Sequence, residues 1–264
     1  MRARGDRSLM ERVLVWAGVL LMLVSLVWWQ LLPRAPLTTG NKIPPPAGPI
    51  TRVVIDAGHG GNDSGAMRNG VEEKNLTLDV ARRLDQLLRA RGLATFLTRS
   101  GDETVSLSQR AAVANREREC IFISIHFDEG GRGAATGVQT FYAVRQATTR
   151  PAMISWLPFL RAASSAPNNL ESQSLAGFVQ DSLVRETQAF NRGTTAEQFY
   201  VVANVHHPAV LVEGGFLSND NDLAQLTSEE YRQKLAGAID DGIMRYREVA
   251  GRARPTLAVD QPQD

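Results

Sequence analysis

The chain has 264 residues, of which 43% are hydrophobic and 22% are charged, and its 29 Lys and Arg nearly balance 28 Asp and Glu. This composition suits one domain with a substantial core and excludes a disordered or fibrous chain. The near-zero net charge offers no general attraction for nucleic acid, so no nucleic-acid partner is expected. The single cysteine, Cys120, excludes an internal disulfide and a cysteine-based metal site.

The first predicted element is a membrane-spanning helix at residues 13–32. This stretch carries no ionisable side chain, and about 20 residues suffice to cross a bilayer as a helix. Four arginines precede it, which places residues 1–12 in the cytoplasm and everything after Pro33 outside the membrane. A cleaved signal peptide is the alternative. The long apolar core and the lack of a small-residue cleavage site favour an uncleaved signal anchor.

A folded domain is expected at residues 51–248, after a Pro- and Gly-rich linker at 33–50. In the domain, short β-branched runs alternate with amphipathic helical patterns. The alternation predicts an α/β fold, a single domain with a mostly parallel mixed sheet of about six strands flanked by helices. The six expected strands are 52–56, 94–98, 121–125, 138–142, 198–202 and 209–213.

Helical patterns separate several of these strands. Apolar residues recur at helical spacing from Leu76 to Leu87, between the first two strands. Ser106 and Gln109 form a possible capping box at the start of a second helix. The remaining expected elements are helices at 174–190 and 228–246 and a disordered tail at 249–264, which has few apolar residues.

Three strand ends carry side chains suited to metal binding or acid–base chemistry. His59 follows the first strand, His126 follows the third, and Glu213 ends the last. Ligands gather at the carboxyl ends of the strands in an open α/β sheet. A catalytic zinc site needs about three nitrogen or oxygen ligands and one open position, which two histidines and one carboxylate provide. Spacing alone leaves Glu72, Glu73 and Glu213 as alternatives for the acidic ligand.

Each of these residues also has an ordinary structural interpretation. A histidine in a Gly-rich turn often makes only a turn hydrogen bond, so neither His59 nor His126 establishes a site alone. Glu213 is different, because a carboxylate at the end of a buried strand is costly unless it is paired, metal-bound or catalytic. Asp56 and Asp63 are interpreted as turn and capping residues. A phosphate-binding Gly-rich turn is disfavoured, since no helix directly follows it.

Five motifs occur along the chain in a fixed order. They are residues 54–66 (VIDAGHGGNDSGA), Glu73-Lys74-Asn75, Thr98-Arg99 with Arg110 and Asn115, Ser124-Ile125-His126, and residues 208–219. In this order they resemble the zinc-dependent N-acetylmuramoyl-L-alanine amidases that cleave bacterial peptidoglycan. The resemblance implies that His59, Glu73 and His126 are zinc ligands and that Glu213 is the catalytic carboxylate.

The resemblance also implies a reaction and a location. The reaction is zinc-assisted hydrolysis of the amide bond between N-acetylmuramic acid and the L-alanine of the stem peptide, in cell-wall remodelling or daughter-cell separation. Glu213 is expected to accept the proton of the attacking water and deliver it to the leaving amine. The expected location is the bacterial cell envelope, with the domain in the periplasm or otherwise outside the inner membrane. A catalytically silent peptidoglycan-binding module is the alternative function.

Some features depart from the family pattern. Phe127 stands where a small residue usually follows the histidine and is expected to reshape the floor of the groove, and Gly214 is an extra glycine. The segment 143–170 has no counterpart in the pattern. Some family members carry a helix that plugs the zinc site until a partner withdraws it. This segment is therefore interpreted as a plug that an activator protein removes, as a membrane-docking surface or as a cover for a sheet edge.

Overall fold

The computed structural model describes residues 15–17, 21–22, 50–127, 135–146 and 169–252. Most of the predicted linker, of the predicted anchor and of the 143–170 segment lies outside these residues, so the predictions made for them stay predictions. In the part of the chain that is described, no helix combines the length and the apolar content that a membrane crossing requires.

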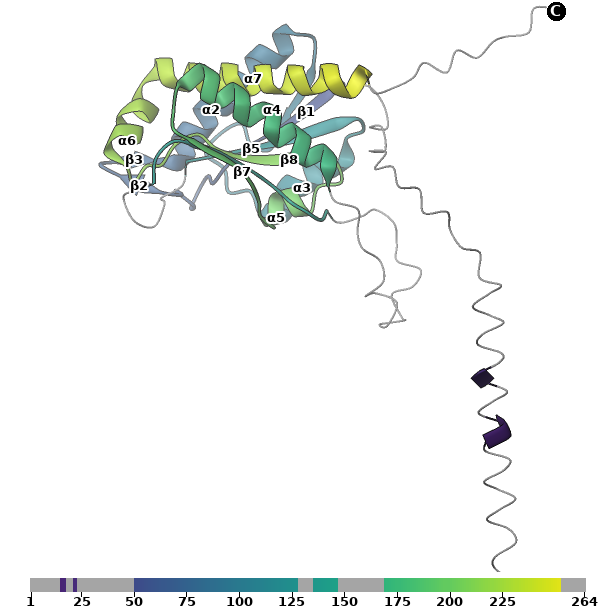
Figure 1. Ribbon diagram of the computed structural model, residues 1–264. Helices are drawn as coiled ribbons and strands as arrows, with labels where there is room; N and C mark the ends of the chain where they lie inside the picture. The colour runs from purple at the N-terminus through teal and green to yellow at the C-terminus, as the bar shows by residue number, and fades with distance from the viewer. Residues whose placement is uncertain (1–14, 18–20, 23–49, 128–134, 147–168, 253–264) are drawn as a thin grey trace, which may run out of the picture. The chain divides into compact units, whose positions relative to one another are not determined.

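A six-stranded mixed sheet forms the centre of the domain (Figure 1). Its strands, in spatial order, are β4 (Ala94–Leu97), β1 (Arg52–Ala57), β5 (Cys120–His126), β8 (Ala209–Glu213), β6 (Val138–Tyr142) and β7 (Asn191–Ala196). The first four are mutually parallel, β6 runs antiparallel to β8, and β7 runs parallel to β6. This architecture confirms the predicted mixed sheet with mostly parallel strands.

Helices cover both faces of the sheet, as Figure 1 shows. One face packs against α2 (Glu73–Ala90) and α4 (Leu170–Thr187), and α7 (Glu229–Arg252) lies against both of these helices. The other face packs against α3 (Leu107–Arg116) and the short α5 (Tyr200–Ala203). Alternate strand residues enter two separate hydrophobic clusters, because successive side chains of a strand point to opposite faces. Val53 and Ile55 join the first cluster, whereas Val54 joins the second.

The helix starts follow local sequence signals. Helix α3 begins with the predicted capping box: Ser106 accepts from the backbone of Gln109, whose side chain accepts from the backbone of Ser106. Helix α2 follows a small hairpin of β2 (Met67–Arg68) and β3 (Val71–Glu72), which the sequence patterns did not reveal. Helix α6 (Asp220–Thr227) was not predicted either, and Asn219 caps it.

One of the six strands was predicted in the wrong place. The predicted strand at residues 198–202 instead overlaps α5, whose Val201 and Val202 are buried against the sheet. The actual strand, β7, has the sequence NRGTTA, which lacks the apolar alternation that identifies a half-buried strand. It lies at the sheet edge, where pairing with β6 through the backbone defines it.

Two helix boundaries also differ from the prediction. Helix α4 begins at Leu170 instead of residue 174 and ends at Thr187, since Gln188 has a left-handed φ of 57°. Helix α7 continues to Arg252, which corrects the predicted start of the tail at Val249. The residues beyond 252 lie outside the described part of the chain.

Candidate active site

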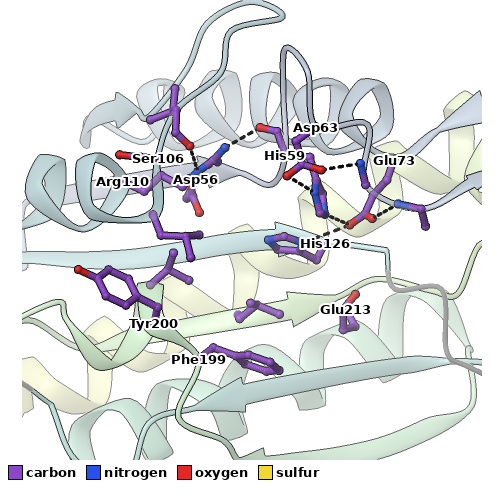
Figure 2. A pocket seen from close by; sticks show the side chains of 16 residues that line it. Asp56, His59, Asp63, Glu73, Ser106, Arg110, His126, Phe199, Tyr200 and Glu213 are labelled. Carbon is purple, nitrogen blue, oxygen red and sulfur yellow. Dashed lines mark hydrogen bonds and ion pairs between the residues drawn. The ribbon is translucent and has the colours of Figure 1, made fainter.

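The three predicted metal ligands meet at the carboxyl edge of the sheet. His59 follows β1, Glu73 begins α2 and His126 ends β5, and one ligand atom of each lies within 4.8 Å of the other two. Oε1 of Glu73 lies 3.1 Å from Nε2 of His59 and 3.1 Å from Nδ1 of His126. Figure 2 shows the three side chains converging on one point. The fold thus joins residues that are far apart in sequence.

The Glu73 carboxylate is fixed from both sides by backbone amides. Its Oε2 accepts from the amide of Ala66 at 2.9 Å, and its Oε1 accepts from the amide of Phe127 at 2.8 Å. Burial alone would raise the pKa of Glu73, but hydrogen bonds with His126 and His59 outweigh it and hold that pKa far below its usual range. The carboxylate of Glu73 therefore favours its anionic form and is held in a defined orientation.

Glu72 does not belong to this cluster. It precedes α2, and its carboxylate faces outward to Asn75 and Lys74, at 3.0 Å and 3.7 Å. Because Glu73 is the first residue of the helix, its side chain points in a different direction from that of Glu72. Of these two adjacent acids, the structure brings only Glu73 together with the two histidines.

The Gly-rich loop after β1 leaves room for the cluster. A Cβ on Gly58 would lie 2.5 Å from Cε1 of His126, and one on Gly65 would lie 2.5 Å from Oε2 of Glu73. His59 itself has a left-handed φ of 60°, a conformation that costs about 1–3 kcal/mol for a residue other than glycine. Gly58 and Gly65 are thus required by their close contact with His126 and Glu73.

The buried ion pair between Arg110 and Asp56 holds the loop that contains His59. Arg110 donates to Oδ1 of Asp56 at 2.8 Å, to the carbonyl of Ala57 at 2.6 Å and to the carbonyl of His59 at 2.6 Å. Asp56 also accepts from Oγ of Ser124 at 2.7 Å. The side chains of Asp56 and Arg110 are 1% and 5% exposed, so Asp56 forms a buried network with the loop instead of the simple turn contact that was predicted.

Asp63 has a direct role at the cluster that the sequence interpretation missed. Its Oδ2 accepts from Nδ1 of His59 at 2.9 Å, and its Oδ1 accepts from the amide of Gly65 at 3.1 Å. A carboxylate on the outer nitrogen of a metal-binding histidine sets the orientation of the ring and increases its basicity. In the sequence, only the i, i+4 spacing of His59 and Asp63 indicated that their side chains could meet.

Phe127 does not form part of the groove, contrary to expectation. Its side chain is fully buried in the core on the α2 side of the sheet. A Cβ on Gly214 would lie 2.7 Å from Cε1 of that ring. Phe127 and Gly214, which are separate departures from the family pattern in the sequence, therefore pack against each other in the structure.

Glu213 lies beside the cluster on the neighbouring strand. It is paired in register with His126 across β5 and β8, so both side chains project from the same face of the sheet. Glu213 is 7% exposed and borders a cavity of about 600 Å³ that is also lined by His59, Glu73 and His126. In Figure 2, His126 lies between Glu73 and Glu213.

The donor set suits zinc. Zinc binds nitrogen and oxygen ligands at about 2.0–2.2 Å, so the ligand atoms of a tetrahedral site lie about 3.3 Å apart. The two separations of 3.1 Å between the histidine nitrogens and Oε1 of Glu73 are close to this value. Three ligands facing a cavity leave a coordination position for water or substrate, as in catalytic zinc sites. A covered α/β sheet with such a cluster and an adjacent glutamate has the elements of a metal-dependent hydrolase.

Comparison with known proteins defines the family. The sequence pattern of N-acetylmuramoyl-L-alanine amidases matches residues 53–245. The amidase AmiA of Escherichia coli is 30% identical over 238 residues, which cover 81% of this chain and 79% of AmiA. The chain belongs to the N-acetylmuramoyl-L-alanine amidase family.

Solved structures agree with this assignment. An N-acetylmuramoyl-L-alanine amidase from Clostridium difficile has a TM-score of 0.63 and 29% identity, with 76% of this chain and 98% of that chain covered. The CwlD amidase from Clostridioides difficile, solved in complex with the GerS lipoprotein, has a TM-score of 0.63 and 27% identity, covering 75% of this chain and 99% of CwlD. The architecture and the amidase family thus coincide.

Proposed function

We propose that this amidase hydrolyses the amide bond between N-acetylmuramic acid and the L-alanine of the peptidoglycan stem peptide, with zinc held by His59, Glu73 and His126. The observation that carries the proposal is the convergence of these ligands on a cavity that also contains Glu213. Bound zinc supplies a Lewis acid that activates water and polarises the scissile carbonyl.

Glu213 is the general base and acid in this proposal. Its carboxylate lies on the strand next to His126 and faces the same cavity, so a water molecule beside the cluster is within its reach. Glu213 accepts the proton from the attacking water and then delivers it to the nitrogen of the departing L-alanine. The carbonyl carbon gains an oxygen from water as the C–N bond breaks, which yields the free lactyl carboxylate and a free amine.

The proposed setting is the bacterial cell envelope. Residues 13–32 would anchor the chain in the inner membrane, with the domain in the periplasm or outside the membrane, where the wall lies. An anchor raises the local concentration of the enzyme at its insoluble substrate. The complex of CwlD with a lipoprotein supports a protein partner for this family, and the 143–170 segment is the proposed contact on this chain.

The change Glu213→Gln tests the proposal in the full-length chain. Gln keeps the size and polarity of the side chain but cannot accept the water proton, so release of peptide from purified sacculi should fall by about 10²–10⁴-fold. Bound zinc, measured by atomic absorption, should remain at one per chain. Glu186→Gln on the exposed surface of α4 is the matched control and should keep full activity.

The alternative is a module that binds peptidoglycan without cleaving it. A chain that binds sacculi, lacks stoichiometric zinc and releases no peptide would support that alternative. Activity that survives Glu213→Gln would instead leave the hydrolase intact and refute the role of Glu213. The two failures are distinguishable because zinc content and peptide release are measured separately.

A further inference from the structure

The last two strands of the sheet, β6 and the edge strand β7, begin at the same end of the sheet as the cluster of His59, Glu73 and His126. Because β6 is antiparallel to β8 and β7 is parallel to β6, the first residues of both strands lie near the last residues of β5 and β8. Gln139, near the start of β6, is paired directly with Glu213. The end of the sheet that carries Glu213 and the cluster therefore also includes the first residues of β6 and β7.

The side chains along this continuation face the same side as the active-site residues. Directly opposite residues of an antiparallel pair project from one face, so Gln139 shares the face of Glu213. Neighbouring strands are about 4.8 Å apart, which places β7 about 10 Å from β8. An extended peptide rises about 3.3 Å per residue, so about three residues span that distance.

Arg192, the second residue of β7, is held in place by two contacts. Its Nε donates to Oε1 of Gln139 at 3.0 Å, and its guanidinium lies 4.7 Å from the centre of the Phe216 ring. The amide of Gln139 is fixed in turn, because its Nε2 donates to Oγ1 of Thr195 at 2.8 Å. Phe216 is buried and forms part of the loop that follows Glu213. Arg192 therefore contacts both the residue paired with Glu213, which is Gln139, and the loop that follows Glu213.

The terminal nitrogens of Arg192 are available to a ligand. Among the residues that the structure describes, no hydrogen bond or ion pair involves Nη1 or Nη2 of this exposed side chain. A guanidinium held through Nε and through its flat face keeps its two outer N–H groups parallel, the arrangement that binds a carboxylate in bidentate fashion. Arg185, an exposed arginine of α4, differs because its guanidinium already contacts Asp241 and Glu186.

We propose that Arg192 binds a carboxylate of the peptide portion of the substrate, on the side of Glu213 away from the metal cluster. The inference rests on the proposed function and specifies which part of the substrate lies over β6 and β7. In that substrate the lactyl carboxyl group is consumed in the scissile amide, whereas a stem peptide that is not cross-linked ends in a free α-carboxylate. A carboxylate-binding arginine therefore assigns this side of the groove to the peptide.

A matched pair of muramoyl-peptide substrates tests the inference on the full-length chain. One substrate carries free peptide carboxylates, and in the other they are converted to carboxamides. The wild type should prefer the free carboxylates by about five- to tenfold in kcat/KM, since the contact resembles a charge-assisted hydrogen bond at a partly exposed site. The preference should reside in KM, because the carboxylate is remote from the reacting amide.

The change Arg192→Gln should bring the ratio of the kcat/KM values of the two substrates to about one. Arg192→Lys keeps the charge but not the fork, and should retain part of the preference. Arg185→Gln, the same change at an exposed arginine of α4, should leave the ratio as in the wild type. Thermal unfolding of each variant confirms that its fold persists.

Several outcomes would overturn the inference: a wild type without preference, an Arg192→Gln variant that retains it, or one that slows both substrates equally. If the wild type cleaves neither substrate, the proposed function fails, and calorimetric binding of the two peptides decides the inference separately. Tighter binding of the carboxylate peptide that disappears in Arg192→Gln would support it, and equal binding of both peptides would refute it.

Discussion

Asp63 accepts a hydrogen bond from His59, with 2.9 Å between Oδ2 and Nδ1. A carboxylate can only accept, so in the neutral ring Nδ1 carries the proton and Nε2 presents its lone pair. Nε2 lies 3.1 Å from Oε1 of Glu73, on the side where the ligand atoms converge. Asp63 therefore selects the tautomer of His59 that can bind a metal.

Replacing this carboxylate should weaken metal binding. In Asp63→Ala, His59 loses the acceptor that fixes its tautomer and ring orientation, and zinc affinity should fall by about 10–100-fold. Competition with a chromogenic chelator measures the affinity. Asp181→Ala, on the exposed surface of α4, is the control and should bind zinc as the wild type does. Unchanged affinity in Asp63→Ala would show that the hydrogen bond does not orient the ligand.

Removal of zinc should lower thermal stability. A ligand that binds only the folded chain contributes about 2.7 kcal/mol at a free concentration of 100 times its Kd. For a domain of this size that corresponds to a rise in Tm of roughly 5–10 °C, which chelation should reverse. Differential scanning calorimetry with and without chelator measures the change. Glu73→Gln should abolish the rise in Tm that zinc causes. A Glu73→Gln variant whose Tm still rises with zinc would contradict the assignment of Glu73 as a ligand.

A methyl group on Gly58 should displace His126. Its Cβ would lie 2.5 Å from Cε1 and 2.6 Å from Nε2 of that ring, so the ring or the loop must move. Gly58→Ala should lose most zinc binding and destabilise the chain by about 1–3 kcal/mol, the usual cost of overpacking. Urea unfolding in the presence of chelator separates the two effects.

The control for this change is Gly177→Ala in the interior of α4, where no atom lies within 4 Å of the added Cβ. Alanine should stabilise that helix by about 0.5–1 kcal/mol and leave zinc binding unchanged. If Gly58→Ala behaves like Gly177→Ala, the close approach of Gly58 to His126 is not required for the site.

Gly214 and Phe127 should be energetically coupled. Gly214→Ala places a methyl group 2.7 Å from Cε1 of Phe127 and 3.1 Å from Leu235, at a cost of about 1–3 kcal/mol. Phe127→Leu leaves a cavity and should also destabilise the chain. In the double variant the methyl group occupies part of that cavity, so the total loss should be smaller than the sum by about 0.5 kcal/mol or more. Urea unfolding of the four chains measures the coupling, and additive losses would refute it.

The sequence by itself determined the α/β class, five of the six strands and the identity of the cluster. Those strands carry dense β-branched runs, and their signal is local. The assignment of Glu73 over Glu72 depended on a motif shared with a known family, because a spacing of one residue does not say which carboxylate faces inward. The start of α2 at Glu73 supplies that physical reason.

Only the tertiary structure decided what surrounds the ligands. Asp63, Arg110 and Gly58 act through contacts that join separate segments or depend on the unusual φ of His59, and no local pattern specifies them. The strand β7 was missed because an exposed edge strand is defined by backbone pairing instead of apolar alternation. That pairing brings Arg192 close to Glu213 in space. No pattern in the sequence indicated this, because Arg192 is far along the chain from His59, Glu73 and His126.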